Sequence, residues 1–265
     1  MQPQLETYLN IASEAAIAGG IILKAYQGHL RDIRSKSEHP GDLVTEADRA
    51  ADAAVIEVLQ RHVPDHSILT EESGRQDGSS AKYLWAIDPL DGTTNYVHRY
   101  PFFATSVALL INEVPQVGAI YDPTHDELFL AATGMGATCN RRPIRVSSTK
   151  ALEQSFLGTY LGFDQPERMG ERLQRVTHLM GHTQGIRQLG SSAMDLAYVA
   201  CGRSDGYWQW QGLSVWDVAA GVVLVREAGG RVTSCQGGVY HAISSEQILA
   251  TNGQIHDALL AALQV

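Results

Sequence analysis

The sequence predicts a mixed α+β and α/β fold in which the two halves of the chain have different patterns. In residues 1–150, two helix-length segments precede short apolar runs separated by turn residues, which predicts an antiparallel meander. In residues 151–265, apolar strands alternate with helices, which is typical of α/β units. Because the sequence contains no linker, internal repeat or low-complexity tract, we expect one domain over residues 1–265, with the two halves as subregions.

The first half opens with two predicted helices, at residues 5–27 and 45–62, where apolar residues recur at helical spacing. Residues 31–42 are polar, with a loop expected at His39-Pro40-Gly41, and the Gly- and Ser-containing residues 71–81 are expected to be a loop. The strand that precedes Pro89 should stop there, because proline has no backbone N–H to donate. The predicted strands of this half are residues 67–70, 84–87, 103–112, 116–121, 127–131, 136–139 and 144–146.

The second half alternates more regularly between strand and helix. Its most apolar helix is predicted over residues 214–228 and ends at Gly229-Gly230, a pair that suits a helix C-terminus. The other predicted helices are residues 166–180, 191–201 and 254–263. The predicted strands are residues 155–159, 185–189, 205–209, 232–234 and 247–250.

The most informative segment is Asp88-Pro89-Leu90-Asp91-Gly92-Thr93, which directly follows a buried strand. A Pro-bent turn can aim both carboxylates at one point, and carboxylate oxygens are ligands that Mg²⁺ prefers. Gly92 lets the backbone approach a ligand, and N–H groups at the start of the following short helix would face an anion. A metal site beside a phosphate site suits phosphoryl chemistry. The alternative is that these are ordinary turn dipeptides and that Asp91 only caps a helix.

Three further segments carry acidic residues. Thr45 and Asp48 form a capping box, which explains both without any function, although Asp48 could also hold a water. Asp217 lies in the first turn of an apolar helix, where the macrodipole favours a carboxylate. Because a buried carboxylate needs a partner, a cation is a good candidate for Asp217. Glu71 and Glu72 directly follow a short strand, where a solvated loop is the alternative.

Polar residues that could contact a substrate occur at two other places. Gly190, Ser191 and Ser192 precede a buried helix and could supply N–H or hydroxyl groups. His98 and Arg99 lie near the Asp88–Asp91 turn, but packing or solvation explains them as well, so we give them no role.

Composition excludes several classes of protein. The net charge of -9 and the lack of a basic stripe argue against a nucleic-acid partner, whereas an acidic protein that binds phosphate needs a cation between them. No segment has the roughly 20 continuous apolar residues needed to span a bilayer, and no signal peptide is visible. The three cysteines form no CxxC pair and are expected to be reduced thiols, so we predict a cytoplasmic protein.

Taken in order, these segments resemble the inositol monophosphatase family. Its three signatures match Glu71-Glu72, the segment from Asp88 to Thr93, and Trp216-Asp217-Val218-Ala219-Ala220-Gly221, and the resemblance covers residues 5–263. The resemblance implies a layered α-β-α-β-α sandwich, of the inositol monophosphatase and fructose-1,6-bisphosphatase type, that forms a homodimer. It also implies a Mg²⁺-dependent phosphatase of small phosphate monoesters, with two or three Mg²⁺ ions per site and inhibition by lithium.

The resemblance implies a metal-binding role for five residues. Glu71, Asp88 and the Leu90 carbonyl should hold a first metal. Asp88, Asp91 and Asp217 should hold a second, with Asp88 bridging the two. These roles agree with the general chemistry of phosphoryl transfer, in which the protein mainly supplies positioning and charge neutralisation.

The resemblance implies phosphate and water contacts for further residues. Gly92 and Thr93 should receive the phosphate, and Glu71 and Thr93 should orient the attacking water. Asp48 should support Thr93, and Asp42 should anchor metal-bound waters.

One departure from the family concerns the substrate alcohol. Inositol-specific members carry a Glu shortly before the Trp-Asp pair, whereas this chain has Gln209 or Trp210 near that place, in a segment one residue longer. An acidic group that binds hydroxyls is therefore replaced by an amide or an indole. Trp208 and Trp210 could stack on a flat leaving group such as imidazole or adenine, or they could pack in the core or in an interface.

The sequence therefore predicts a Mg²⁺-dependent phosphatase with myo-inositol 1-phosphate as its leading substrate. Rivals with the same chemistry are phosphatases of histidinol phosphate, of fructose 1,6-bisphosphate or of a nucleotide 3′-phosphate. A rival from another class is a catalytically inactive binding or regulatory protein of this fold. Intact Glu71, Asp88, Asp91, Thr93 and Asp217 argue against that last possibility.

Overall fold

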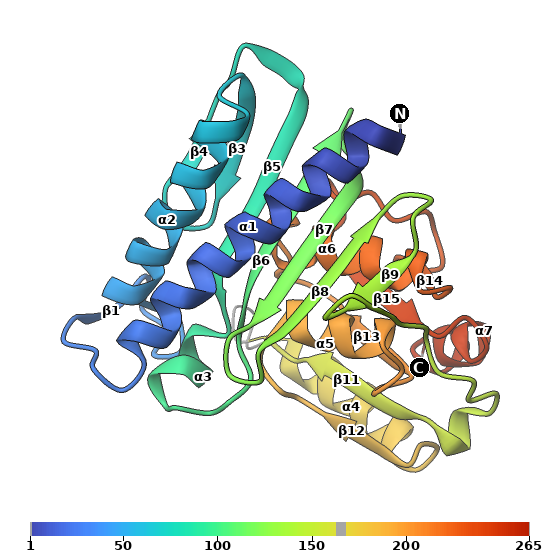
Figure 1. Cartoon of the computed structure of the whole chain (residues 1–265). Coiled ribbons are helices and arrows are strands. Elements are labelled where there is room, and N and C mark those ends of the chain that lie inside the picture. The colour runs from blue at the N-terminus through green and yellow to red at the C-terminus, as the bar shows by residue number, and fades with distance from the viewer. Residues whose placement is uncertain (1, 163–167, 265) are drawn as a thin grey trace.

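Helices and sheets alternate in five layers, as Figure 1 shows. The structure is a computed structural model that describes residues 2–162 and 168–264. Helices α1 (Gln2–Tyr26) and α2 (Glu46–His62) cover one face of a large sheet, and α5 (Ser192–Ala200) and α6 (Val215–Glu227) lie between that sheet and a smaller one. Helices α4 (Met169–Met180) and α7 (His256–Ala262) cover the outer face of the smaller sheet. The expected α-β-α-β-α sandwich is confirmed.

The large sheet has eight strands and is antiparallel except where β3 and β5 run parallel. Its strands in spatial order are β10 (Arg142–Pro143), β9 (Ala137–Cys139), β8 (Glu127–Ala132), β7 (Val114–Asp122), β6 (Ala104–Ile111), β5 (Ser80–Asp91), β3 (His66–Thr70) and β4 (Gly74–Gln76). The predicted meander is confirmed for β5 to β9. The only other sheet of this half in the described part of the chain joins β1 (Ile33–Ser35) to β2 (Leu43–Thr45).

Four details of the first half differ from the prediction. The strand expected at 144–146 is absent, because the Ile144 N–H bonds to Ala137 and the Val146 N–H bonds to Ala228, at the end of α6. The expected loop 71–81 contains β4, and the polar segment 31–42 contains β1, a strand that was not expected. Strand β5 does not stop at Pro89 but continues to Asp91, because a bulge absorbs the proline.

The smaller sheet has five strands and mixed directions. Its order is β12 (Gly185–Arg187), β11 (Phe156–Tyr160), β13 (Gly206–Gln209), β15 (Ile248–Thr251) and β14 (Arg231–Thr233). Strand β11 is parallel to both neighbours, whereas β15 is antiparallel to both of its own. A short 3-10 helix η1 (Leu152–Gln154) precedes this sheet. The helix expected at 166–180 begins at Met169, and residues 166–167 lie outside the described residues.

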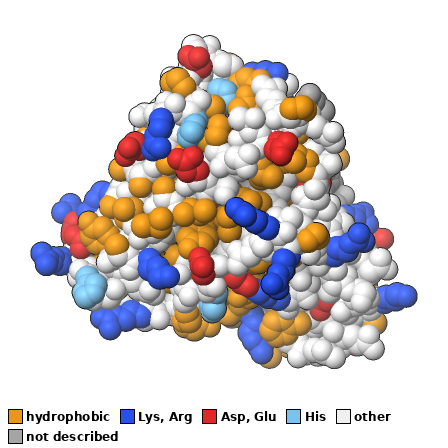
Figure 2. Space-filling view, in the orientation of Figure 1, with side chains coloured by type: hydrophobic (Ala, Val, Ile, Leu, Met, Phe, Trp, Pro, Cys, Tyr) orange, Lys and Arg blue, Asp and Glu red, His pale blue; other side chains and the backbone are white. Residues whose placement is uncertain are grey.

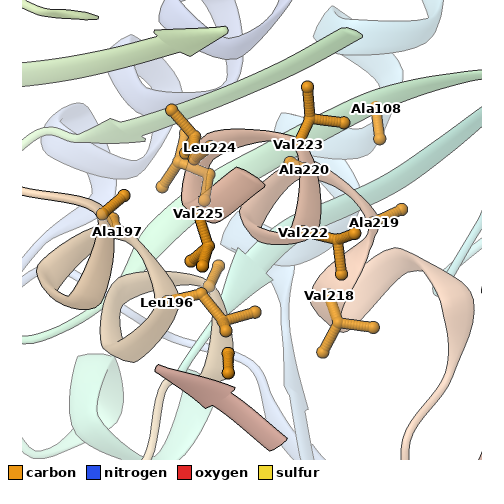
Figure 3. Close-up of a cluster of buried hydrophobic side chains, with 14 of the residues drawn as sticks. Ala108, Leu196, Ala197, Val218, Ala219, Ala220, Val222, Val223, Leu224 and Val225 are labelled. Carbon is orange, nitrogen blue, oxygen red and sulfur yellow. The ribbon is translucent and has the colours of Figure 1, made fainter. Parts of the chain in front are cut away.

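Helix α6 forms the centre of the molecule because both of its faces are apolar. Side chains from α6 meet those of α5 and β6 in the cluster of Figure 3. The approach to the large sheet is so close that a Cβ on Gly118 of β7 would lie 2.5 Å from the Ala220 carbonyl oxygen. Glycine at this position therefore sets the distance between the two layers.

The surface carries mixed charges. On the face shown in Figure 2, basic side chains are separated by acidic, apolar and other groups and form no continuous stripe. Within residues 2–162 and 168–264, no helix has the length and apolar character required to cross a membrane.

Candidate active site

Most of the acidic residues singled out in the sequence line one cavity of about 360 Å³, but Asp48 and Glu72 do not. It opens where β3 and β5 end, next to the first turns of α5 and α6. The residues of the predicted site that line it are Asp42, Glu71, Asp88, Leu90, Asp91, Gly92, Thr93, Gly190, Ser192, Gln209 and Asp217. Side chains from both halves of the chain therefore face a common space.

A bulge in β5 brings Asp88 and Asp91 to the same side of the strand. Asp88 pairs with Ser106 and Asp91 with Ala104, so three steps along β5 match two steps along β6. In a regular strand, residues three apart would point to opposite faces, whereas the extra residue removes that difference. The Leu90 N–H donates to Asp88 Oδ1 at 3.0 Å, and this bond fixes the Asp88 carboxylate.

Thr93 follows a left-handed turn and is held by a buried carboxylate. Gly92 has φ 96° and is the N-cap of α3 (Thr93–Val97). The first N–H groups of this helix have no acceptor within the helix. The Thr93 hydroxyl lies 3.1 Å from both Asp48 Oδ1 and the Leu90 carbonyl oxygen. The N–H and hydroxyl of Thr45 donate to Asp48 Oδ2 at 2.8 and 2.6 Å. Asp48 therefore caps α2 and contacts Thr93 at the same time.

Asp217 has the same double position at the start of α6. The Ser214 N–H donates to Asp217 Oδ2 at 2.7 Å. This is the capping-box bond in which the side chain at N3 accepts from the backbone of the N-cap residue. The same side chain lines the cavity together with Asp88 and Asp91. Because α6 is buried between the two sheets, its first turn is held rigidly relative to β5.

Lys36, which the sequence analysis did not single out, contacts the acidic cluster. Its ammonium lies 2.9 Å from Glu71 Oε1 and 2.5 Å from Glu72 Oε1. Burial disfavours the charged form of Lys36, but the two glutamates outweigh this effect and raise its pKa. Lys36 lies directly after β1, in a segment that is polar throughout, so no pattern in the sequence marks it.

Burial makes the carboxylates of the cavity difficult to ionise without a cation. Burial, followed by the charges of Glu71, Asp91 and Asp217, raises the pKa of Asp88 well above its ordinary value. Burial also raises the pKa of Asp217 well above its ordinary value, and that of Asp91 to about 6. The charged forms of these carboxylates are therefore disfavoured unless a cation balances them.

The donor set fits a hard divalent cation. The side chains that line the acidic end of the cavity offer carboxylate and hydroxyl oxygens, and Mg²⁺ is bound by oxygen. As the side chains stand, no three His, Cys, Asp or Glu of the described part of the chain could hold one ion together. Glu71 nevertheless lies within reach of Asp88, because a hydrogen bond from Glu71 is among the causes that raise the pKa of Asp88.

The first turn of α5 holds the Asp91 carboxylate through hydrogen bonds. Ser191 Oγ and the Ala193 N–H both donate to Asp91 Oδ2 at 2.6 Å. Ser191 is buried and does not line the cavity, whereas Gly190 and Ser192 do. The sequence suggested that Ser191 contacts a substrate. The structure instead places it behind Asp91, outside the lining of the cavity.

Gln209 and Trp210 point to different places. Gln209 lines the cavity, and its Oε1 accepts from Tyr207 Oη at 2.6 Å and from Ser192 Oγ at 3.2 Å. Trp210 does not line the cavity, because its ring is stacked under Arg175 at 4.2 Å. Trp208 is buried in the core of the smaller sheet. Of the two alternatives left open for these indoles, packing is the one that the structure shows.

Comparisons with known proteins agree with this architecture. The model of the inositol monophosphatase family matches residues 4–265. An inositol-1-monophosphatase of Synechocystis sp. is 48% identical over 98% of this chain and 89% of its own length. A Nus factor SuhB of Pseudomonas aeruginosa is 41% identical over 100% of this chain and 97% of its own length.

A solved structure shows the same fold. The inositol monophosphatase from Anabaena (Nostoc) sp. superposes with a TM-score of 0.89 and 52% identity, over 98% of this chain and 96% of that one. The likeness therefore extends over both sheets and all the elements that line the cavity. The chain belongs to the inositol monophosphatase family and is a phosphatase.

Proposed function

We propose that this phosphatase hydrolyses a monophosphate ester of a small neutral polyol with the help of Mg²⁺, and that myo-inositol 1-phosphate is its leading substrate. The observation that carries the proposal is the set of carboxylates from β5 and α6 that face the same cavity as the Gly92-Thr93 turn. We expect Glu71, Asp88 and the Leu90 carbonyl to hold one ion.

Asp88, Asp91 and Asp217 would hold a second ion, and Asp42 would orient waters around the pair. When bound, Mg²⁺ supplies charge neutralisation for the phosphate and lowers the pKa of a bound water. Because the buried carboxylates have raised pKa values, a divalent ion that binds them would displace protons, and its affinity should rise with pH.

The chain's own residues would orient the reactants. The Gly92 turn brings the first N–H groups of α3 to the cavity, where they can donate to phosphate oxygens. Thr93 and Glu71 would orient the attacking water. The hydrogen bond from Thr93 to Asp48 fixes the rotamer of the hydroxyl, so that a lone pair stays directed at the cavity.

The wall away from the carboxylates is neutral, and this favours a polyol. It is formed by Tyr160, Gln188, Leu189, Gln209 and Gly212, and no Lys, Arg or His lines the cavity within the described residues. The second phosphate of a sugar bisphosphate or of a nucleotide bisphosphate would therefore lack a cationic partner. The ammonium and imidazole of histidinol would likewise lack a free carboxylate once the ions are bound.

A phosphate-release screen tests the proposal. It compares inositol 1-phosphate, histidinol phosphate, fructose 1,6-bisphosphate and a nucleotide 3′-phosphate, with Mg²⁺ and with a chelator. We expect release that depends on Mg²⁺ and is fastest for the inositol ester, and Asp91→Asn should lower turnover by orders of magnitude without unfolding the protein. A preference for histidinol phosphate or for the bisphosphate would refute the substrate class, and release in chelator would refute the metal.

A second candidate is a binding or regulatory role, which the name Nus factor SuhB suggests for several relatives that are about 40% identical to this chain. A protein with only this role would not need the five side chains that the family resemblance assigns to catalysis, which are Glu71, Asp88, Asp91, Thr93 and Asp217. Failure to release phosphate from every ester tested would favour it. We further propose, from the family resemblance, a cytoplasmic homodimer that lithium inhibits, and light scattering and a lithium titration would test this.

A further inference from the structure

The Asp91 carboxylate is held from the opposite half of the chain. Asp91 ends β5 in the large sheet, whereas Ser191 and Ala193 begin α5 in the middle layer. Two hydrogen bonds, from Ser191 Oγ and the Ala193 N–H, reach the same oxygen, Oδ2, at 2.6 Å, and the Ser192 backbone N–H also interacts with this carboxylate. Ser191 is also the N-cap of α5, since its Oγ accepts from the Met194 N–H at 3.3 Å. One serine therefore caps the helix and anchors a carboxylate of the cavity.

A second contact fixes the same loop nearby. Asn95 Nδ2 on α3 donates to the Leu189 carbonyl at 2.6 Å and to the Phe102 carbonyl at 2.7 Å. Gly92 and Gly190 approach so closely that a Cβ on Gly92 would lie 3.3 Å from the Gly190 carbonyl oxygen. The loop that leads into α5 is thus clamped against the turn that follows Asp91.

We propose that Ser191 is a positioning residue for the metal site: with the start of α5 it occupies Asp91 Oδ2 and leaves only Oδ1 for a divalent ion. This inference rests on the proposed function, because it presumes that Asp91 is a metal ligand. Hydrogen bonds of 2.6 Å to a carboxylate are short and directional, so they define which way the second oxygen points. The ion site is then complete only when the loop before α5 is docked on the large sheet.

The neighbouring serine provides a matched control. Ser192 lies one residue along the same turn, but its hydroxyl contacts Tyr207 Oη at 2.9 Å and Gln209 Oε1 and does not touch Asp91. Its substitution should therefore alter the neutral wall of the cavity and leave the Asp91 carboxylate in place.

Direct binding of Mn²⁺, followed by electron paramagnetic resonance of the free ion, measures the site without any substrate. We expect Ser191→Ala to weaken Mn²⁺ binding about tenfold, which corresponds to about 1.4 kcal/mol. Ser191→Thr, which keeps the hydroxyl, should restore binding, and Ser192→Ala should leave it unchanged. Thermal unfolding of the ion-free variants checks that each one is folded.

The outcomes separate the inference from the proposed function. If the wild-type protein binds no Mn²⁺ and releases no phosphate, the proposed function fails and the inference fails with it. If the wild-type protein does both and Ser191→Ala binds Mn²⁺ as tightly as wild type, only the inference is overturned. Equal losses in Ser191→Ala and Ser192→Ala, or no rescue by threonine, would show a general loosening of α5 and would also overturn it.

Discussion

Lys36 should compete with a divalent ion for Glu71, and Lys36→Met tests this competition. The Lys36 ammonium lies 2.9 Å from Glu71 and 2.5 Å from Glu72, whose side chain is only 8% exposed. Removal of one partner from a buried ion pair costs about 3–5 kcal/mol, because the remaining charge stays buried. The Lys36 side chain is 25% exposed, so water screens part of this loss. We therefore expect the ion-free variant to be about 2 kcal/mol less stable than wild type.

Addition of Mg²⁺ should reverse much of this loss. An ion that binds only the folded state stabilises it by about 2.7 kcal/mol at a hundredfold excess over its dissociation constant. In the wild type, part of that gain is used to displace Lys36 from Glu71, whereas in Lys36→Met no ammonium has to be displaced. The increase in the free energy of unfolding on adding Mg²⁺ should therefore be larger in the variant.

Urea unfolding in chelator and in saturating Mg²⁺ gives both quantities. Arg34→Met is the matched control, because Arg34 lies two residues before Lys36 but its side chain is 69% exposed and pairs with Asp32 at 2.8 Å. An exposed pair of this kind contributes less than about 1 kcal/mol, and its loss should not depend on Mg²⁺. Equal stabilisation of wild type and Lys36→Met by Mg²⁺ would refute the competition.

Two further predictions concern the frame that holds the site. His256 is buried between two threonine hydroxyls at 2.9 and 3.0 Å, and burial lowers its pKa from 6.5 to about 4. Neutral His256 should thus add about 3 kcal/mol of stability above pH 6.5 that is lost as the pH falls towards 4. Urea unfolding of His256→Gln should lack this pH-dependent loss, and parallel curves for the two proteins would contradict the assignment. Gly118→Ala should cost about 2 kcal/mol, because its Cβ would meet the Ala220 carbonyl at 2.5 Å. Gly170→Ala, at an open position of α4, should instead gain up to about 1 kcal/mol, and similar values for the two alanines would contradict the packing argument.

The sequence predicts well the features that depend on local pattern. The helices follow from apolar periodicity, and the first turn of α2 follows from Thr45 and Asp48, which lie three positions apart. The layered arrangement was implied by the family resemblance. The positions of Glu71 and Asp88 after apolar strands and of Asp217 in a first helical turn marked them as candidates, and the family resemblance implied that they converge. The resemblance to a known family then supplied roles that the spacing alone left open.

Features that depend on contacts between distant segments were not predictable. The bulge after Asp88 depends on the register between β5 and β6, and no residue of β5 specifies that register alone. Lys36 meets Glu71 because β1 pairs with β2 beside the end of β3, and polar residues give no periodic signal there. Trp210 could be placed only once Arg175 of α4 was seen to stack on it.

For Asp91 the sequence leaves capping and function as alternatives, whereas for Asp48 it allows both, and the structure shows how one carboxylate can serve both. Asp217 uses one oxygen for the Ser214 N–H and lines the cavity. Asp48 uses one oxygen for Thr45 and the other for Thr93. Asp91 likewise gives one oxygen to the start of α5. A carboxylate that caps a helix uses only one oxygen to accept a hydrogen bond from a backbone N–H that has no intrahelical acceptor. This bond also fixes the orientation of the second oxygen. A capping signal in an acidic first turn therefore does not count against a functional role.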